Sequence, residues 1–169
     1  KGCNNFCTYC IVPYTRGREI SRRIDEIVTD VRRLVEEKNI KEVTLLGQNV
    51  NSFGKENDET IAQLIMKLEA IDGLQLLRYT SSHPFNVSDE LIAAHGVSKK
   101  LSPHLHLPVQ SGSDSVLERM KRRHTRTHYL EILRKLRLAN PKIVISSDII
   151  VGFPNETEEE YNDTLKLLD

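Results

Sequence analysis

Apolar residues recur along this chain with two alternating periodicities. Spacings of three and four residues predict long helices that begin near Ile24, Ile61 and Tyr129. Shorter helices are predicted around Leu91, Val116 and Tyr161. Compact apolar runs predict strands over Lys41–Leu46, Leu74–Thr80, Leu101–Val109 and Ile143–Val151. The last run is almost continuously apolar and β-branched, which predicts a strand covered on both faces.

Three helix starts carry capping residues. Thr60 with Gln63, and Thr157 with Glu160, have the spacing of a capping box, in which each partner satisfies a free backbone amide of the other. Ser88 stands directly before the helix around Leu91 and is a good first-turn acceptor. These residues predict where the helices begin.

Alternating strands and helices predict an α/β fold with mostly parallel strands that curl into a partial (βα) barrel. Polar clusters follow the predicted strands, at Gln48 and Asn49, Ser81–His83, Gln110–Ser113, and Ser147 and Asp148. Ligands of such folds bind at the carboxyl ends of the strands. Each cluster alone is also compatible with ordinary turn residues, but four together favour one shared site.

Composition narrows the class of protein. The chain has 169 residues, which suggests one domain. It has no apolar run long enough for a membrane-spanning helix, and no signal peptide is visible, so neither is expected. Its 24 basic and 24 acidic residues cancel, which argues against a module that binds nucleic acid by bulk charge alone. RNA held mainly by other domains is not excluded. The lack of an initiator Met suggests a piece of a longer protein.

All the cysteines lie in one short segment, as Cys3, Cys7 and Cys10. An odd number of cysteines fits poorly with disulfides and suggests a reducing compartment, the cytoplasm. Three interpretations compete: unrelated structural thiols, a zinc site completed by a histidine such as His83, His104 or His106, and a 4Fe–4S cluster. Three cysteines would leave one iron of a cluster without a protein ligand, so that a small molecule can bind there. The compact Gly- and Asn-rich loop favours this last interpretation.

The segment resembles the signature of the radical S-adenosylmethionine superfamily, in which an aromatic residue (here Tyr9) precedes the third cysteine. Cys10-Ile-Val-Pro-Tyr-Thr-Arg-Gly17 with Ser21-Arg22 resembles the methylthiotransferases within it. Further similar blocks cover essentially the whole chain: Leu46-Gly-Gln-Asn-Val-Asn-Ser52, Ser81-Ser-His-Pro84, Leu105–Gly112 and Ser147–Pro154. The expected domain is therefore a radical S-adenosylmethionine core over residues 1–169, truncated at both ends.

The resemblance implies a mechanism and its cofactors. Cys3, Cys7 and Cys10 would hold a 4Fe–4S cluster whose open iron binds S-adenosylmethionine. One electron would split the latter to a radical that takes hydrogen from carbon 2 of an adenine ring, to which a methylthio group is then joined. The cofactors carry this chemistry, so no catalytic side chain is assigned. The family also implies a second 4Fe–4S cluster in an N-terminal domain and a C-terminal RNA-binding domain, both expected outside this chain.

The resemblance and the polar clusters together give candidate S-adenosylmethionine contacts. These are Tyr9, Gly47, Gln48, Ser81, Gln110, Ser147, Asp148 and Gly152. Tyr9 could instead serve loop packing, and Gly47 and Gln48 could act through backbone carbonyls. Ser81, Gln110, Ser147 and Asp148 contact either the ligand or the residues behind it. Gly152 would allow close approach of the backbone.

Basic residues and histidines have less certain roles. Arg16 or Arg22 could pair with a carboxylate or phosphate. The run Lys121–Arg126 either touches tRNA phosphates or is a solvated helix end. For His83 and His106, structural hydrogen bonding is favoured over metal ligation.

Gln48-Asn49-Val50-Asn51 favours the branch that modifies isopentenyladenosine of tRNA. The alternatives are methylthiolation of a ribosomal-protein aspartate or of threonylcarbamoyl-adenosine, and a non-enzymatic metal- or RNA-binding module. The expected partners are tRNA and an electron donor such as a flavodoxin or ferredoxin, with no membrane and a monomeric protein.

Overall fold

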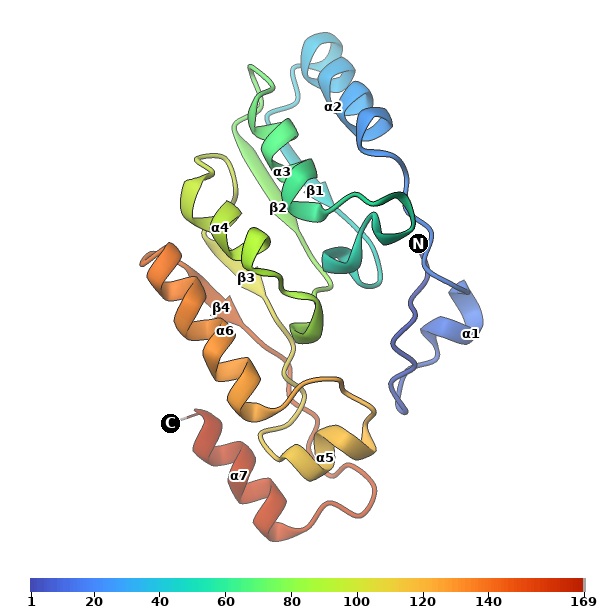
Figure 1. Cartoon of the computed structure of the whole chain (residues 1–169), viewed down its shortest axis with the longest axis vertical. Helices are drawn as coiled ribbons and strands as arrows, with labels where there is room; N and C mark the ends of the chain where they lie inside the picture. Colours follow the sequence, from blue (N-terminus) through green and yellow to red (C-terminus); the bar gives the residue numbers. More distant parts are fainter. Residues whose placement is uncertain (169) are drawn as a thin grey trace.

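The computed structural model describes residues 1–168, whose strands form two parallel pairs (Figure 1). Strand β1 (Glu42–Leu45) pairs with β2 (Leu76–Tyr79), with Glu42 opposite Leu76. Strand β3 (His104–His106) pairs with β4 (Val144–Ser146), with His104 opposite Val144. Because both pairs are parallel, the carboxyl ends of paired strands lie at the same edge.

A single parallel bridge between Leu77 and Leu101 joins the two pairs. The Leu77 amide donates to the carbonyl of Lys100 at 2.7 Å, and the amide of Ser102 donates to the carbonyl of Leu77 at 2.8 Å. The strands therefore follow one another in the order β1, β2, β3 and β4, as a partial barrel of parallel strands. This confirms the predicted fold class.

Helices connect and flank the strands. The α-helices are α1 (Val12–Arg16), α2 (Ile24–Lys38), α3 (Ile61–Glu69), α4 (Asp89–Val97), α5 (Asp114–Arg119), α6 (Arg126–Ala139) and α7 (Glu158–Leu168). Short 3₁₀ turns follow β1 and β2, as η1 (Val50–Ser52), η2 (Lys55–Asn57) and η3 (Pro84–Asn86). Helix α2 packs on α3, α3 on α4, and α4 on α6.

The predicted caps are present. Thr60 Oγ1 accepts from the amide of Gln63 at 3.1 Å, and Gln63 Oε1 accepts from the amide of Thr60 at 3.0 Å. The same reciprocal pair joins Thr157 and Glu160, at 3.3 and 2.9 Å. Ser88 Oγ accepts from the amide of Leu91. Local sequence therefore sets these helix starts.

Helix α1 was not predicted, because its five residues hold too few apolar positions to show a period. A proline near its start fits the missing hydrogen bonds of a first helical turn, and Gly17 ends it with a φ of 74°. This helix places a rigid turn directly after Cys10.

The hydrophobic core lies between the strands and the helices α2, α3, α4 and α6 on one face of the sheet (Figure 1). Alternate strand residues point into it, including Leu77 and Leu105, which are at most 1% exposed. The helices contribute Leu68, Leu91 and Leu136, each fully buried. Because alternate strand residues are buried on this face, the residues between them point to the opposite face of the sheet.

The prediction that Ile143–Val151 is covered on both faces is wrong. Only Val144–Ser146 forms a strand, Val144 is 61% exposed, and Val151 is 63% exposed. In the part of the chain that the structure describes, the helices cover one face and no further strand pairs with the outer edge of β4. The sequence shows that this run is apolar, but it does not show which elements pack against it.

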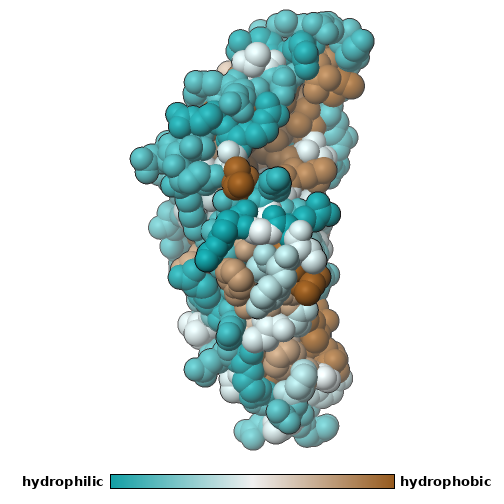
Figure 2. Space-filling view, turned by 90° about the vertical axis from the view of Figure 1, so that its right-hand side faces the viewer, coloured by the Kyte–Doolittle hydropathy of each residue, from teal (hydrophilic) through white to brown (hydrophobic). Residues whose placement is uncertain are grey.

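The exposed surface is uneven. Figure 2 shows hydrophobic residues along the right-hand edge of that view and hydrophilic residues over most of the rest. Leu46, directly after β1, is 79% exposed. Within residues 1–168, no helix is both long and apolar enough to cross a membrane.

Candidate functional site

The three cysteines lie in an N-terminal loop that precedes α1. A backbone hydrogen bond joins the start of this loop to the residue that follows α1. The amide of Cys3 donates to the carbonyl of Gly17 at 3.1 Å, and the amide of Cys10 donates to the carbonyl of Cys7 at 3.0 Å. Cys3 and Cys7 are buried, while Cys10 is partly exposed. None of the three forms a disulfide within residues 1–168.

Gly2 anchors the base of this loop. Its φ is +80°, and a Cβ there would lie 1.9 Å from the carbonyl oxygen of Arg18, so a side chain cannot fit. Its amide donates to Oε1 of Gln48 at 2.6 Å. The cysteine loop is thereby tied to the turn that follows β1.

The tip of the loop is tied to the end of α5. The amide of Thr8 donates to the carbonyl of Met120 at 3.1 Å, and Thr8 Oγ1 donates to the carbonyl of Arg119 at 3.0 Å. Since α5 follows β3, the loop spans from the carboxyl end of β1 to that of β3. Parallel topology therefore brings the cysteines to the predicted mouth.

Burial raises the pKa of the Cys3 thiol, an effect partly offset by a backbone hydrogen bond from Asn5. The nearby charges of Glu19, Cys7 and Cys10 raise it further, which shows that the three sulfurs share one electrostatic environment. A positive metal centre reverses this balance, because it stabilises thiolates. A metal centre bound by the loop would therefore offset the cost of ionising the buried Cys3 thiol.

The donor set fits a multi-iron cluster. Among residues 1–168, no three His, Cys, Asp or Glu side chains are grouped so that they could hold one metal ion. A 4Fe–4S cluster gives each cysteine its own iron, so the three sulfurs need not converge on one point. Soft thiolates in one loop, close enough to sense each other's charge, meet that requirement.

Gly47 and Gln48 line a cavity of about 200 Å³ at the carboxyl end of β1, together with Gly2 and Asn49. Apolar side chains, including those of Leu45 and Phe53, complete the wall of this cavity. Gln48 was predicted to meet S-adenosylmethionine, but its side-chain oxygen is engaged by Gly2. The observed contact of Gln48 with Gly2 holds the cysteine loop in place.

Ser81 and Gln110, which follow β2 and β3, both have left-handed backbone conformations, with φ of 64° and 77°. This conformation is strained for residues other than glycine and concentrates at functional sites. The carbonyl of Ser81 accepts from the amide of Val50 at 3.1 Å, which joins the turns after β1 and β2. Two predicted site residues therefore hold unusual turns at the same edge.

Ser147, Asp148 and Gly152 follow β4. Ser147 Oγ accepts from the amide of Val109 at 2.9 Å, and Asp148 Oδ2 lies 3.3 Å from Nε2 of His106. Within residues 1–168, no hydrogen bond joins these three residues to the cysteine loop. The structure therefore brings together the cysteines, Gly47 and Gln48, and places Ser147, Asp148 and Gly152 at the same edge without direct contact.

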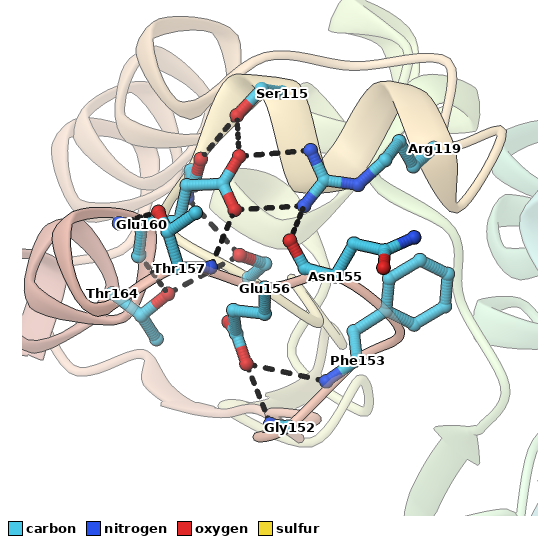
Figure 3. A network of polar contacts seen from close by, with 11 residues as sticks. Ser115, Arg119, Gly152, Phe153, Asn155, Glu156, Thr157, Glu160 and Thr164 are labelled. Carbon is cyan, nitrogen blue, oxygen red and sulfur yellow. Dashed lines mark hydrogen bonds and ion pairs between the residues drawn. The ribbon is translucent and has the colours of Figure 1, made fainter.

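The turn at Gly152 is already occupied by a carboxylate. Glu156 Oε2 accepts from the amides of Gly152 at 2.5 Å and Phe153 at 3.2 Å (Figure 3). Gly152 has a φ of +74°, and a Cβ there would meet no atom within 4 Å. Glycine is thus favoured here by conformation, and the open space leaves room for a ligand beside it.

The predicted basic run divides into two parts. Lys121 and Arg123 are exposed, whereas His124 is 5% exposed and Arg122 turns toward the cysteine loop. Arg122 Nη1 donates to Sγ of Cys7 at 3.7 Å. The contact of Arg122 with Cys7 was missed, because no pattern in the basic run distinguishes the arginine that points inward.

The remaining polar residues have local partners. Arg22, which precedes α2, pairs with Asp30 on that helix at 2.7 Å, and Arg16 is exposed. His83 Nδ1 accepts from the amide of Phe85 at 3.2 Å, and His106 contacts Asp148. Both histidines have structural hydrogen bonds, as expected.

Sequence comparison gives relatives for the whole chain. It is 52% identical to a protein of Ruegeria sp. (strain TM1040), and 55% identical to one of Thermoanaerobacter sp. (strain X514), covering 100% and 99% of this chain. A protein of Acidithiobacillus ferrooxidans is 54% identical over 100% of it. Each relative is named tRNA-2-methylthio-N(6)-dimethylallyladenosine synthase. The chain spans 36 to 39% of the length of these curated relatives.

Solved structures share the fold. The cobalamin-dependent S-adenosylmethionine radical enzyme OxsB, with aqua-cobalamin and S-adenosylmethionine bound, aligns with 99% of this chain and 25% of its own, with a TM-score of 0.71 and 18% identity. Its apo form aligns with a TM-score of 0.65. At this identity the likeness concerns the fold alone. Residues 1–168 also match the family model described as the Radical SAM superfamily. The chain therefore belongs to the radical S-adenosylmethionine superfamily, whose cofactors are a 4Fe–4S cluster and S-adenosylmethionine.

Proposed function

We propose that this chain is the radical core of a tRNA methylthiotransferase that adds a methylthio group to isopentenyladenosine. The observation that carries this proposal is the identity of 51 to 55% with proteins named for that reaction, over essentially the whole chain. The branch-specific segment Gln48–Asn51 lies in that aligned region. The chain therefore carries the core of this activity, and the longer protein performs it.

Cys3, Cys7 and Cys10 would hold the cluster. When bound, the cluster and S-adenosylmethionine supply the electron and the radical that make the adenine carbon reactive. The protein orients these groups and keeps water away. Gln48 fixes the loop through Gly2, and Thr8 fixes its tip against α5.

The remaining predicted residues would surround S-adenosylmethionine. Tyr9 is part of the cysteine loop, and Gly47 lines the cavity that Gly2 also lines. Ser81 and Gln110 project from the strained turns after β2 and β3, and Ser147, Asp148 and Gly152 lie after β4. These positions support contact with ribose, carboxylate or substrate, since ligands of this fold bind at the carboxyl ends of strands.

The tRNA would approach the same edge of the sheet. Lys121 and Arg123 are exposed beside the mouth and offer positive charge to phosphates. Arg16 could add to it from α1. In this proposal the protein works as a monomer in the cytoplasm, with a flavodoxin- or ferredoxin-type electron donor and with a second cluster in the N-terminal part of the longer protein.

The test uses the full-length gene, deleted and then restored, with mass spectrometry of the nucleosides of cellular tRNA. We expect deletion to remove the methylthio group from isopentenyladenosine and restoration to return it. A Cys7→Ala gene should fail to restore it, because one cluster ligand is gone. Thr29→Ala, an exposed change on α2, is the matched control and should restore it fully.

Unchanged tRNA after deletion would overturn the substrate assignment. A methylthio group lost from a ribosomal-protein aspartate, or from threonylcarbamoyl-adenosine, would then identify one of the two alternative substrates. Full restoration by the Cys7→Ala gene would contradict the role of the cysteine loop itself.

A further inference from the structure

Arg122 connects the cysteine loop to the end of β3. Its Nη2 donates to the carbonyl of Pro108 at 2.6 Å. Its Nη1 lies 3.7 Å from Sγ of Cys7 and 3.4 Å from the hydroxyl of Tyr9. One end of the guanidinium is thus fixed to backbone, and the other faces a predicted cluster ligand.

The described residues around Arg122 do not neutralise its positive charge. Its Nε is buried and has no hydrogen-bond partner within residues 1–168. His83 and His124 lie close enough for its charge to act on them; both are at most 5% exposed, and their rings are 5.7 Å apart and nearly perpendicular. No carboxylate forms an ion pair with Arg122 in the described part of the chain, so its positive charge is not neutralised there.

The two histidines stay neutral. Burial and the nearby charge of Arg122 lower the pKa of His83 to about 2 and that of His124 to about 3. A guanidinium carries a permanent positive charge in proteins. The fixed positive charge in this buried group therefore belongs to Arg122.

We propose that Arg122 is a positioning residue that sets the reduction potential of the cluster held by Cys3, Cys7 and Cys10. This inference rests on the cluster site of the proposed function and not on the identity of the tRNA substrate. Reduction adds one electron from a low-potential donor to the cluster, with no bond made or broken and no proton transferred. The reduced cluster is more negative by one charge, so a guanidinium beside Cys7 stabilises it.

The direction of the effect follows from this charge. Hydrogen bonds to the sulfurs and the net charge of the site are among the factors that set cluster potentials. Without Arg122 the reduced state loses a positive charge that lies 3.7 Å from Sγ of Cys7, and the cluster becomes harder to reduce. Partial burial of the contact limits screening by water and salt.

The experiment is a redox titration of the full-length protein, followed by electron paramagnetic resonance. The signal that changes when S-adenosylmethionine is added identifies the cluster with the open iron and separates it from any second cluster. In Arg122→Gln we expect the reduced-to-oxidised ratio at a fixed potential to fall about tenfold, a shift of about 59 mV for one electron. Arg122→Lys keeps the charge and should retain most of the parent potential.

Arg123→Gln is the matched control. It removes the same charge one residue away, from an exposed guanidinium that lies 4.2 Å from the ring centre of Phe85. Its potential should match the parent, because water screens an exposed charge.

Three results would overturn the proposal: an unchanged potential in Arg122→Gln, an equal shift in Arg123→Gln, or loss of iron from Arg122→Gln in place of a shift. The last would assign Arg122 to loop assembly. A parent protein with no signal that responds to S-adenosylmethionine would overturn both the cluster site and this inference. Failure of the tRNA assignment alone would leave the potential shift in place.

Discussion

Single hydrogen bonds decide how the cysteine loop is held. Gln48 was expected to contact S-adenosylmethionine, because it follows β1 at the mouth. Its side chain instead accepts the amide of Gly2, at a position where only glycine fits. A buried amide that loses its acceptor costs about 1–3 kcal/mol, so this contact matters for the order of the loop.

Replacing Gln48 by Ala should therefore loosen the cluster. Iron–sulfur absorbance of Gln48→Ala, followed in the presence of an iron chelator, should decay about tenfold faster than that of the parent, since the loop opens more often. Gln48→Glu keeps an acceptor oxygen and should restore most of the lifetime. Weaker binding of S-adenosylmethionine with an unchanged cluster lifetime would show instead that Gln48 acts as the ligand contact first expected.

At the scale of elements, local signals set the helices well and the strands less well. Caps at Thr60, Ser88 and Thr157 begin the helices α3, α4 and α7 as predicted. The strands are shorter than the apolar runs that contain them. One contact between elements was not visible in sequence: the hydroxyl of Tyr79 on β2 lies 2.6 Å from Nε2 of His95 on α4.

His95 should make the fold sensitive to acid. Burial lowers its pKa from the usual 6.5 to about 4, so between these values the unfolded chain binds a proton that the folded chain does not. The stabilisation is complete above about pH 6.5 and is lost as the pH falls to about 4, by about 1.4 kcal/mol per pH unit.

Urea unfolding of the parent and of His95→Gln at several pH values between 7 and 4.5 measures this loss. The stability of the variant should fall less steeply with acid, by the contribution of one histidine. Equal slopes for the two proteins would show that His95 is protonated in the folded state.

At the scale of the whole molecule, α7 closes the end of the chain against the turn after β3. Arg119 on α5 forms a bidentate ion pair with Glu160 on α7, at 2.8 Å for both contacts (Figure 3). Side-chain hydrogen bonds from Arg119 and Ser115 hold the pKa of Glu160 well below its usual range. Beside this pair, the amide of Gly112 donates to Oγ1 of Thr164 at 2.9 Å.

Gly112→Ala should separate α7 from this turn. A Cβ would lie 2.6 Å from both the carbonyl oxygen of Asp163 and Cα of Thr164, which are backbone atoms that cannot rotate away. Overpacking of this kind costs about 1–3 kcal/mol. Hydrogen exchange should rise in α7 and remain unchanged in α3. Equal protection of α7 in the variant and the parent would contradict the contact.

The sequence alone determined the periodicity of the helices, their caps, the parallel class of the sheet and the grouping of three soft ligands in one loop. Periodicity and caps depend on neighbours within about four residues, and the ligand grouping on a motif of eight. The parallel class follows from the alternation of strands and helices along the chain. Only the tertiary structure decided that Arg122 contacts Cys7, that Gln48 accepts the amide of Gly2, and that Val144 lies exposed. Such outcomes depend on groups far apart in the chain, whose distances are set when helices cover one face of the sheet and leave the other open.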